Sequence, residues 1–322
     1  MGGAALMRTI LPFFQASPDG LRGLMQLCYS MVATVMCSVQ QLSPEPNIMI
    51  PTVPVHSMAQ GILPPALFDW VTLGSSTAPT ADVPGAELLS IITSFVQLSA
   101  SVRSQLLRDR HPETERVLHE ALEIEELLNR WETNLDDMWQ FTEERMDDGF
   151  FPPDAVFEGC YHLYSDMWTA RVWTNYRFAR ILVNQMLLEG VERFPFTGPS
   201  LVSASQQQRS QDVISRVARD TLVSVSTHYR HPRLGRSQCE ILEKTQGGAG
   251  IGAVQIPTLL FQIKVASAAP GVPPYYRAWG LAMMRTIFAD TGMLQASRLA
   301  DILEKSANKS PWQPVNVKTE TF

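Results

Sequence analysis

Apolar residues recur every three or four positions along most of this chain, and that spacing predicts helices. The clearest case is Tyr161 to Asn184, which contains no glycine or proline and repeats large residues at helical period. Its apolar stripe is too broad for a helix with one face in water, so we expect residues 155–189 to form a central buried helix. No segment shows convincing strand alternation. The predicted fold class is therefore all-α, a multi-helix bundle or irregular helical array around this central aromatic helix.

The same period predicts helices before the central one. An N-terminal helical part covers residues 1–72, where Ser17 is a suitable N-cap and Pro18 suits the first helical position. Residues 73–86 are rich in glycine, proline, serine and threonine, which indicates a linker. We expect residues 87–189 to form a helical core that includes the central helix.

After the core, the pattern predicts a loop and then more helices. Residues 190–209 contain glycine, proline, serines and three consecutive glutamines, which favours a mobile loop. Residues 210–305 read as a C-terminal helical part, in which 275–304 is one helix or two helices broken near Gly292. We expect the tail, 306–322, to be loose.

Aromatic rings and arginines share the central helix. An isolated buried guanidinium is costly, so we expect Arg171, Arg177 and Arg180 to have partners, with Asp166 as an ion-pair partner of Arg171 or Arg177. Aromatic residues on a central helix more often pack than line a ligand site. The candidates for core packing or for lining a small-molecule pocket are Trp168, Trp173, Tyr176, Arg177 and Arg180.

Composition fits a globular domain, since 45% of the 322 residues are hydrophobic and 18% are charged. The four cysteines lie far apart without any C-x-x-C, which predicts reduced thiols rather than a zinc cluster or a disulfide framework. Residues 1–14 lack the pattern of a signal peptide. The charge-free stretch 23–44 keeps helical spacing and several glutamines, so we expect a buried helix and no membrane span.

Charge argues against direct contact with nucleic acid. The net charge is −6, and residues 109–158 hold 16 of the 32 acidic residues but 4 of the 26 basic ones. Such an acidic segment repels a phosphate backbone. We therefore expect no direct nucleic-acid binding by this chain.

Two short motifs imitate known sites without completing them. Thr245–Gly252 is glycine-rich like a dinucleotide loop, but no hydrophobic strand precedes it. His119, Glu120 and Glu123 share one helix face as in zinc hydrolases, yet the second histidine of that pattern is missing. A flexible loop and a solvated helix face are the better interpretations.

Two further sets of polar residues have some features of metal sites. His228, His231 and Cys239 are loosely spaced, and two histidines in a loop are more often surface residues. The aspartate pairs at 136–137 and 147–148 resemble those of helical prenyl-diphosphate enzymes but lack the third carboxylate. The sequence thus predicts no catalytic, cofactor-binding or metal-binding residue, no cofactor and no enzyme.

The central segment carries the pattern Ser165-Asp166-x-Trp168-x-Ala170-x-x-Trp173-x-x-Tyr176-Arg177-x-x-Arg180-Ile181-Leu182-x-Asn184. This pattern resembles the C-terminal regulatory region of fungal binuclear zinc-cluster transcription factors. Shorter likenesses in the same order are Pro64–Trp70 and Gly292–Leu303, so the resemblance covers most of the chain to about residue 305.

This resemblance implies a helical effector region of a transcription regulator, located in the nucleus. It implies protein partners or self-association and leaves room for a small-molecule effector. The cysteine-rich DNA-binding module of the family is not seen, which suggests a truncated gene product or a stand-alone paralogue. With no basic import signal, a cytoplasmic location is the alternative. The alternatives in function are a helical enzyme acting on an isoprenoid-type apolar substrate and an inactive truncated product.

Overall fold

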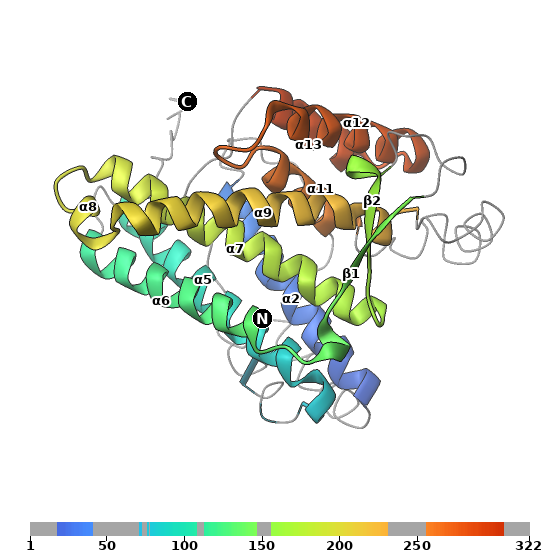
Figure 1. Ribbon diagram of the computed structural model, residues 1–322, viewed down its shortest axis with the longest axis horizontal. Coiled ribbons are helices and arrows are strands. Elements are labelled where there is room, and N and C mark those ends of the chain that lie inside the picture. Colours follow the sequence, from blue (N-terminus) through green and yellow to red (C-terminus); the bar gives the residue numbers. More distant parts are fainter. Residues whose placement is uncertain are drawn as a thin grey trace, which may run out of the picture. The chain divides into compact units, whose positions relative to one another are not determined.

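Helices dominate the computed structural model, which describes residues 18–40, 71–72, 76, 78–107, 113–146, 156–230 and 256–305 (Figure 1). This confirms the predicted all-α class, with one two-stranded sheet among the described elements. The described residues fall into two compact units. The first unit contains those up to Asn134 together with Met186–Gln207, and the second contains Leu135–Gln185 and those from Gln208 onwards.

Three long helices build the first unit: α2 (Pro18–Gln40), α5 (Val83–Leu107) and α6 (Thr114–Thr133). α5 packs against both α2 and α6. Their contacting faces carry the apolar residues at helical period, and these are buried: Leu24, Cys28, Val32, Leu88, Ile92, Phe95, Val117, Ala121 and Leu128. Thr80–Val102 is long and apolar enough to cross a membrane, but 61% of its apolar window is buried, as in a core helix.

Polar ties in the first unit converge on the beginning of α5. Arg22 of α2 makes an ion pair with the buried Asp82, with 2.9 Å between the guanidinium and the carboxylate. The Tyr29 hydroxyl donates to the Gly85 carbonyl at 2.6 Å. Trp131 of α6 donates its ring N–H to the Pro84 carbonyl at 2.7 Å. Helix α5 thus begins inside the predicted linker, because neighbouring helices hold its first turn.

The central helix, α7 (Met167–Arg193), begins twelve residues later than the predicted span 155–189. Asp166 acts as its N-cap, since its Oδ1 accepts from the Thr169 backbone N–H at 2.7 Å. The residues just before the cap form a strand instead of a further helical turn. Tyr161 and Tyr164 fitted the helical period by coincidence, so the predicted start of the helix was wrong.

That strand belongs to an antiparallel hairpin in the second unit. β1 (Thr142–Arg145) pairs with β2 (Cys160–Leu163), with Glu143 opposite His162. The prediction of no strand was therefore wrong. Each strand has four residues and β1 is wholly polar, so neither offers an apolar alternation.

The predicted mobile loop, 190–209, is mostly helical. α7 continues to Arg193, a short helix α8 (Gly198–Leu201) follows, and α9 (Ala204–His228) begins before the glutamines. Glutamine is a good helix former, and the Ser203 hydroxyl caps α9 by accepting from the Gln206 N–H at 3.2 Å.

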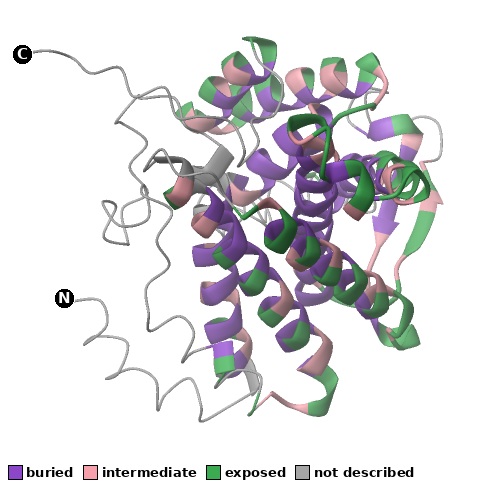
Figure 2. Cartoon of the chain, turned by 90° about the vertical axis from the view of Figure 1, so that its left-hand side faces the viewer, coloured by how far each residue is buried: buried purple, intermediate pink, exposed green. Residues whose placement is uncertain are grey.

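The second unit ends with α11 (Ile256–Ser267), α12 (Pro274–Thr291) and α13 (Leu294–Lys305). Gly292 has φ 67° and donates its N–H to the Phe288 carbonyl at 2.8 Å, which ends α12 in the left-handed manner that favours glycine. Two helices broken near Gly292, one of the two predicted alternatives, are confirmed. Figure 2 shows most helices with a buried side and an exposed side. The predicted tail, 306–322, lies outside the described residues.

Candidate functional site

The five candidate residues of the central helix are all buried. Their exposed fractions are 7% for Trp168, 2% for Trp173, 0% for Tyr176, 1% for Arg177 and 2% for Arg180. Of the two predicted roles, core packing is the one that this burial supports. α7 is buried on all sides over 172–187, which is why no simple amphipathic face is visible in its sequence.

Arg177 lies in a cage of aromatic rings and polar atoms. Its NH1 donates to the Tyr164 hydroxyl at 2.6 Å, and its NH2 lies 3.2 Å from Nδ1 of His162. Its Cζ lies 4.7 Å from the centre of the Phe141 ring and 5.3 Å from that of Trp173. Ring faces stabilise a desolvated guanidinium by cation–π attraction. The expectation that this buried arginine has partners is confirmed.

The other two arginines differ from Arg177. Arg180 donates to the Tyr176 hydroxyl and lies over its ring at 5.6 Å. Arg171 is half-buried; burial lowers its pKa, and the charge of Asp166 opposes that shift. The charge of Asp166 thus acts on Arg171, whereas the hydrogen-bond partners of Arg177 are His162 of β2 and Tyr164 directly after it.

His162 is the buried histidine of the hairpin, with no exposed surface. Thr227 of α9 fixes its backbone by donating to its carbonyl at 2.6 Å. Burial, and then the positive charge of Arg177 and Arg219, lower the pKa of His162 to about 2, so the imidazole is neutral. A guanidinium can only donate, so Nδ1 accepts from Arg177 and Nε2 carries the proton.

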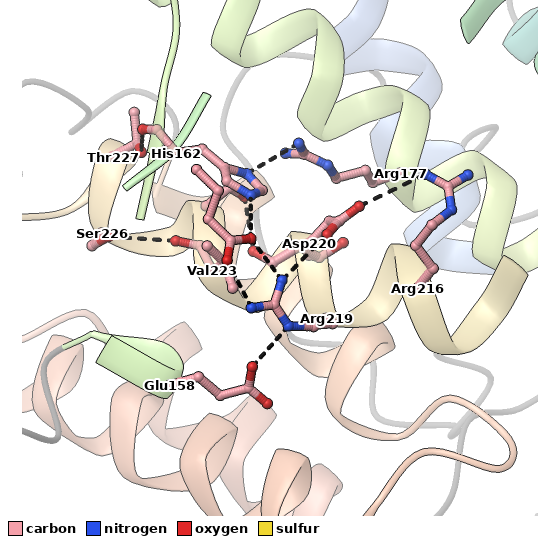
Figure 3. Close-up of polar contacts among 12 residues, drawn as sticks. Glu158, His162, Arg177, Arg216, Arg219, Asp220, Val223, Ser226 and Thr227 are labelled. Carbon is pink, nitrogen blue, oxygen red and sulfur yellow. Dashed lines mark hydrogen bonds and ion pairs between the residues drawn. The ribbon is translucent and has the colours of Figure 1, made fainter. Parts of the chain in front are cut away.

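Arg219 of α9 joins separate elements through carboxylates (Figure 3). Its NH1 and NH2 donate to Oε2 and Oε1 of Glu143 at 2.7 and 2.9 Å. Its Nε donates to Glu158 at 2.7 Å, and the Tyr275 hydroxyl of α12 donates to the same carboxylate at 2.6 Å. The hydrogen bonds from Arg219 hold the pKa of Glu143 below its usual range. We call these four residues the Arg219 clasp.

Glu158 adopts an unusual backbone within this clasp. It lies in the short helix η4 (Phe157–Gly159) with φ 53° and ψ 20°, and Gly159 follows with φ 66°. A non-glycine residue in the left-handed region is disfavoured by about 1 kcal/mol or more. The two hydrogen bonds from Arg219 and Tyr275 hold the Glu158 side chain, which offsets this strain.

The hairpin and α9 bring three ligand-type side chains together. One oxygen of Glu143, one ring nitrogen of His162 and one oxygen of Asp220 all lie within 4.8 Å of one another. Sequence reasoning missed all three, because Glu143 and His162 meet only through strand pairing. The sequence held a hint for Asp220 alone, because Arg216 and Asp220 are four residues apart, the spacing of an ion pair along a helix.

For two other motifs with histidines, the structure supports one interpretation and contradicts the other. His119 and Glu123 are exposed on α6, and Glu120 pairs with Arg116 at 2.6 Å, which supports the solvated-face interpretation. His228 was predicted to be a surface loop residue, which is wrong. It is the last residue of α9, buried, with Nε2 at 2.8 Å from the Thr174 hydroxyl.

Several predicted features cannot be placed in a site. Asp136 and Asp137 are exposed beside the short helix η2 (Asp137–Trp139). Their counterparts at 147–148, together with His231, Cys239 and the glycine-rich segment 245–252, lie outside the described residues. Comparisons of the chain with protein-family models, with curated proteins and with solved structures found no match.

Proposed function

We propose that this chain is a helical effector or partner-binding module of the transcription-regulator type. Its partners are other proteins or a second copy of the chain. It works in the nucleus and acts through contacts rather than catalysis.

One observation carries the proposal. Most of the residues on which the resemblance to zinc-cluster regulators depends are buried in α7, while Ser165 and Asp166 are exposed just before it. Those that are buried are Trp168, Ala170, Trp173, Tyr176, Arg177, Arg180, Ile181, Leu182 and Asn184, while Asp166 caps the helix. A resemblance at such positions concerns the scaffold, because buried residues decide how a helix packs. This supports a helical body of the same kind.

The exposed face of α6 supports the expectation that duplex DNA is not bound. Glu115, Glu123 and Glu126 are exposed there, and Arg116 is engaged by Glu113 and Glu120. A face of this charge is repelled by phosphates and suits a basic protein partner.

A tethering experiment tests the proposal. The full chain is fused to an unrelated DNA-binding domain and expressed with a reporter gene that carries the matching sites. We expect reporter output to change several-fold, in either direction, relative to the DNA-binding domain alone. The matched control is Trp173→Ala, which removes a buried ring and its hydrogen bond to the Trp139 carbonyl and should abolish the effect.

Two results would contradict the proposal. One is an unchanged reporter when the fusion is folded and nuclear. The other is sequence-specific binding of duplex DNA by the isolated chain at physiological salt.

A further inference from the structure

The cluster of Glu143, His162 and Asp220 has a donor set to which the proposed function assigns no role. A neutral imidazole and two carboxylates are donors that suit Zn²⁺, Co²⁺ and similar ions. The donors come from three elements, because Glu143 and His162 are cross-strand partners and Asp220 lies on α9. Figure 3 shows the Asp220 carboxylate linked to Arg216 and Arg219.

A separate observation points to a ligand at this place. His162 is completely buried, yet its Nε2 has no hydrogen-bond partner among the described residues. Oε2 of Glu143 lies 3.7 Å from this atom. A buried nitrogen without a partner is costly, and such an atom facing two carboxylates marks a place for a bound group.

We propose that Glu143, His162 and Asp220 bind one divalent transition-metal ion, with Zn²⁺ as the best match. Nitrogen and oxygen donors lie about 2 Å from Zn²⁺, so neighbouring donors around it are roughly 3 to 3.5 Å apart. The His162–Glu143 distance of 3.7 Å is close to this spacing. The span of 4.8 Å across the cluster closes with small side-chain rotations.

Two arginines compete with the ion, Arg219 most directly, and Arg216 with its NH1 3.8 Å from Asp220 Oδ2. The NH1 of Arg219 lies 2.7 Å from Glu143 Oε2 and 3.9 Å from Asp220 Oδ1, so a guanidinium neutralises the same oxygens. On binding, the ion takes Oε2, while Arg219 keeps Glu143 Oε1 and Glu158. A positive charge this close weakens cation binding, so Arg219→Met should tighten it by about tenfold or more.

Tyr164 is a positioning residue for the metal-bound histidine. A metal at Nε2 requires the tautomer that carries its proton on Nδ1, and that proton needs an acceptor. Metal binding therefore moves the proton from Nε2 to Nδ1 and breaks the hydrogen bond from Arg177 NH2 to Nδ1. The Tyr164 hydroxyl, 3.2 Å from Nδ1, becomes the acceptor and still accepts from Arg177 NH1. Loss of such a partner lowers metal affinity by about 10- to 100-fold, which we expect for Tyr164→Phe.

The test is calorimetric titration of the full, reduced, chelator-treated chain with ZnCl₂. Co²⁺ serves as the spectroscopic probe and Mg²⁺ as the ion that should not bind, because it prefers oxygen donors and water. We expect one Zn²⁺ per chain through this site and a visible Co²⁺ spectrum of a nitrogen and oxygen site. Asp220→Asn and His162→Gln should remove both signals. Asp212→Asn, an exposed aspartate two turns earlier on α9, should leave them unchanged.

Each variant must be shown to fold, so that loss of the metal site is distinguished from unfolding. Circular dichroism checks the helical content of each variant, and if His162→Gln does not fold, Asp220→Asn and Tyr164→Phe decide. The proposal is overturned by absence of Zn²⁺ binding to the wild-type chain, or by binding that survives in folded Asp220→Asn. An Arg219→Met chain that binds Zn²⁺ no more tightly than the wild type would also overturn it. None of these results bears on the tethering experiment.

Discussion

Among the described residues, the first compact unit buries the carboxyl groups of Asp82 and Glu125, whereas the second buries arginine, histidine and lysine side chains. The first unit is built from apolar helix faces, and the polar ties described above gather at one place, the first turn of α5. The second unit buries Arg177 and His162 in its interior and connects its elements through the Arg219 clasp.

This difference separates two physical ways of specifying a structure. The free energy gained by burying apolar side chains is roughly proportional to the area buried and depends little on pH or salt. Buried polar groups depend on geometry, because each donor or acceptor that loses its partner carries its own desolvation penalty. The two units should therefore respond differently to acid, salt and substitution.

The largest expected effect is that of Arg177→Met. The change leaves the Tyr164 hydroxyl and His162 Nδ1 without their donor in a buried place. We expect a loss of about 3 to 5 kcal/mol in the free energy of unfolding, measured by urea denaturation. Leu88→Ala is the matched apolar change in the first unit and should cost about 2 to 4 kcal/mol. An Arg177→Met chain as stable as the wild type would show that the cage is dispensable.

Next in size is the effect of acid, through His162. Its folded pKa of about 2 lies below the ordinary 6.5, so between these values the unfolded chain takes up a proton that the folded chain refuses. Stability is therefore lost as pH falls below 6.5, by about 2 kcal/mol between pH 6.5 and 4.5 from this group. The lowered pKa of Glu143 acts in the same direction at lower pH.

Urea denaturation at several pH values measures this slope. His162→Gln should flatten it over pH 4.5 to 6.5, whereas His119→Gln, an exposed histidine on α6, should not. An equal slope in the wild type and in His162→Gln would show that the buried imidazole is not its source.

A smaller effect is expected when the Arg219 clasp is opened. Arg219→Met removes the contacts to Glu143 and Glu158, which are partly exposed, so we expect a loss of roughly 1 to 2 kcal/mol at low salt. The difference should shrink at high salt, because exposed charges are screened. Arg130→Met, which removes a 3.7 Å pair between exposed side chains, should change stability little at any salt. A salt-independent Arg219 effect would indicate packing instead of charge.

The smallest effect belongs to the first unit. Tyr29→Phe removes the hydrogen bond to the Gly85 carbonyl and should lower stability by about 1 kcal/mol. The loss should be equal at pH 5 and pH 8 and at low and high salt, as the tyrosine and its acceptor are neutral. A loss that varied with salt would remove the contrast between the units.

The helical period of apolar residues predicted helices correctly where one face of the helix is apolar along its length. It located α2, α5, α6 and α13 because their apolar residues repeat along one face. It failed at Tyr161 and Tyr164, where spacing alone cannot distinguish a short strand followed by a cap from one more turn of helix. It also failed at 190–209, where polar helix formers were read as a loop.

By itself, the sequence determined that the chain forms helices, that α7 is its interior, and that the arginines buried there have partners. Local periodicity and the cost of an isolated buried charge were sufficient for those conclusions. Only the tertiary structure decided which partners they are, and that Glu143, His162 and Asp220 meet. Those contacts depend on strand register and on the rotation of α9, which bring together residues up to 77 positions apart and leave no periodic trace in the sequence.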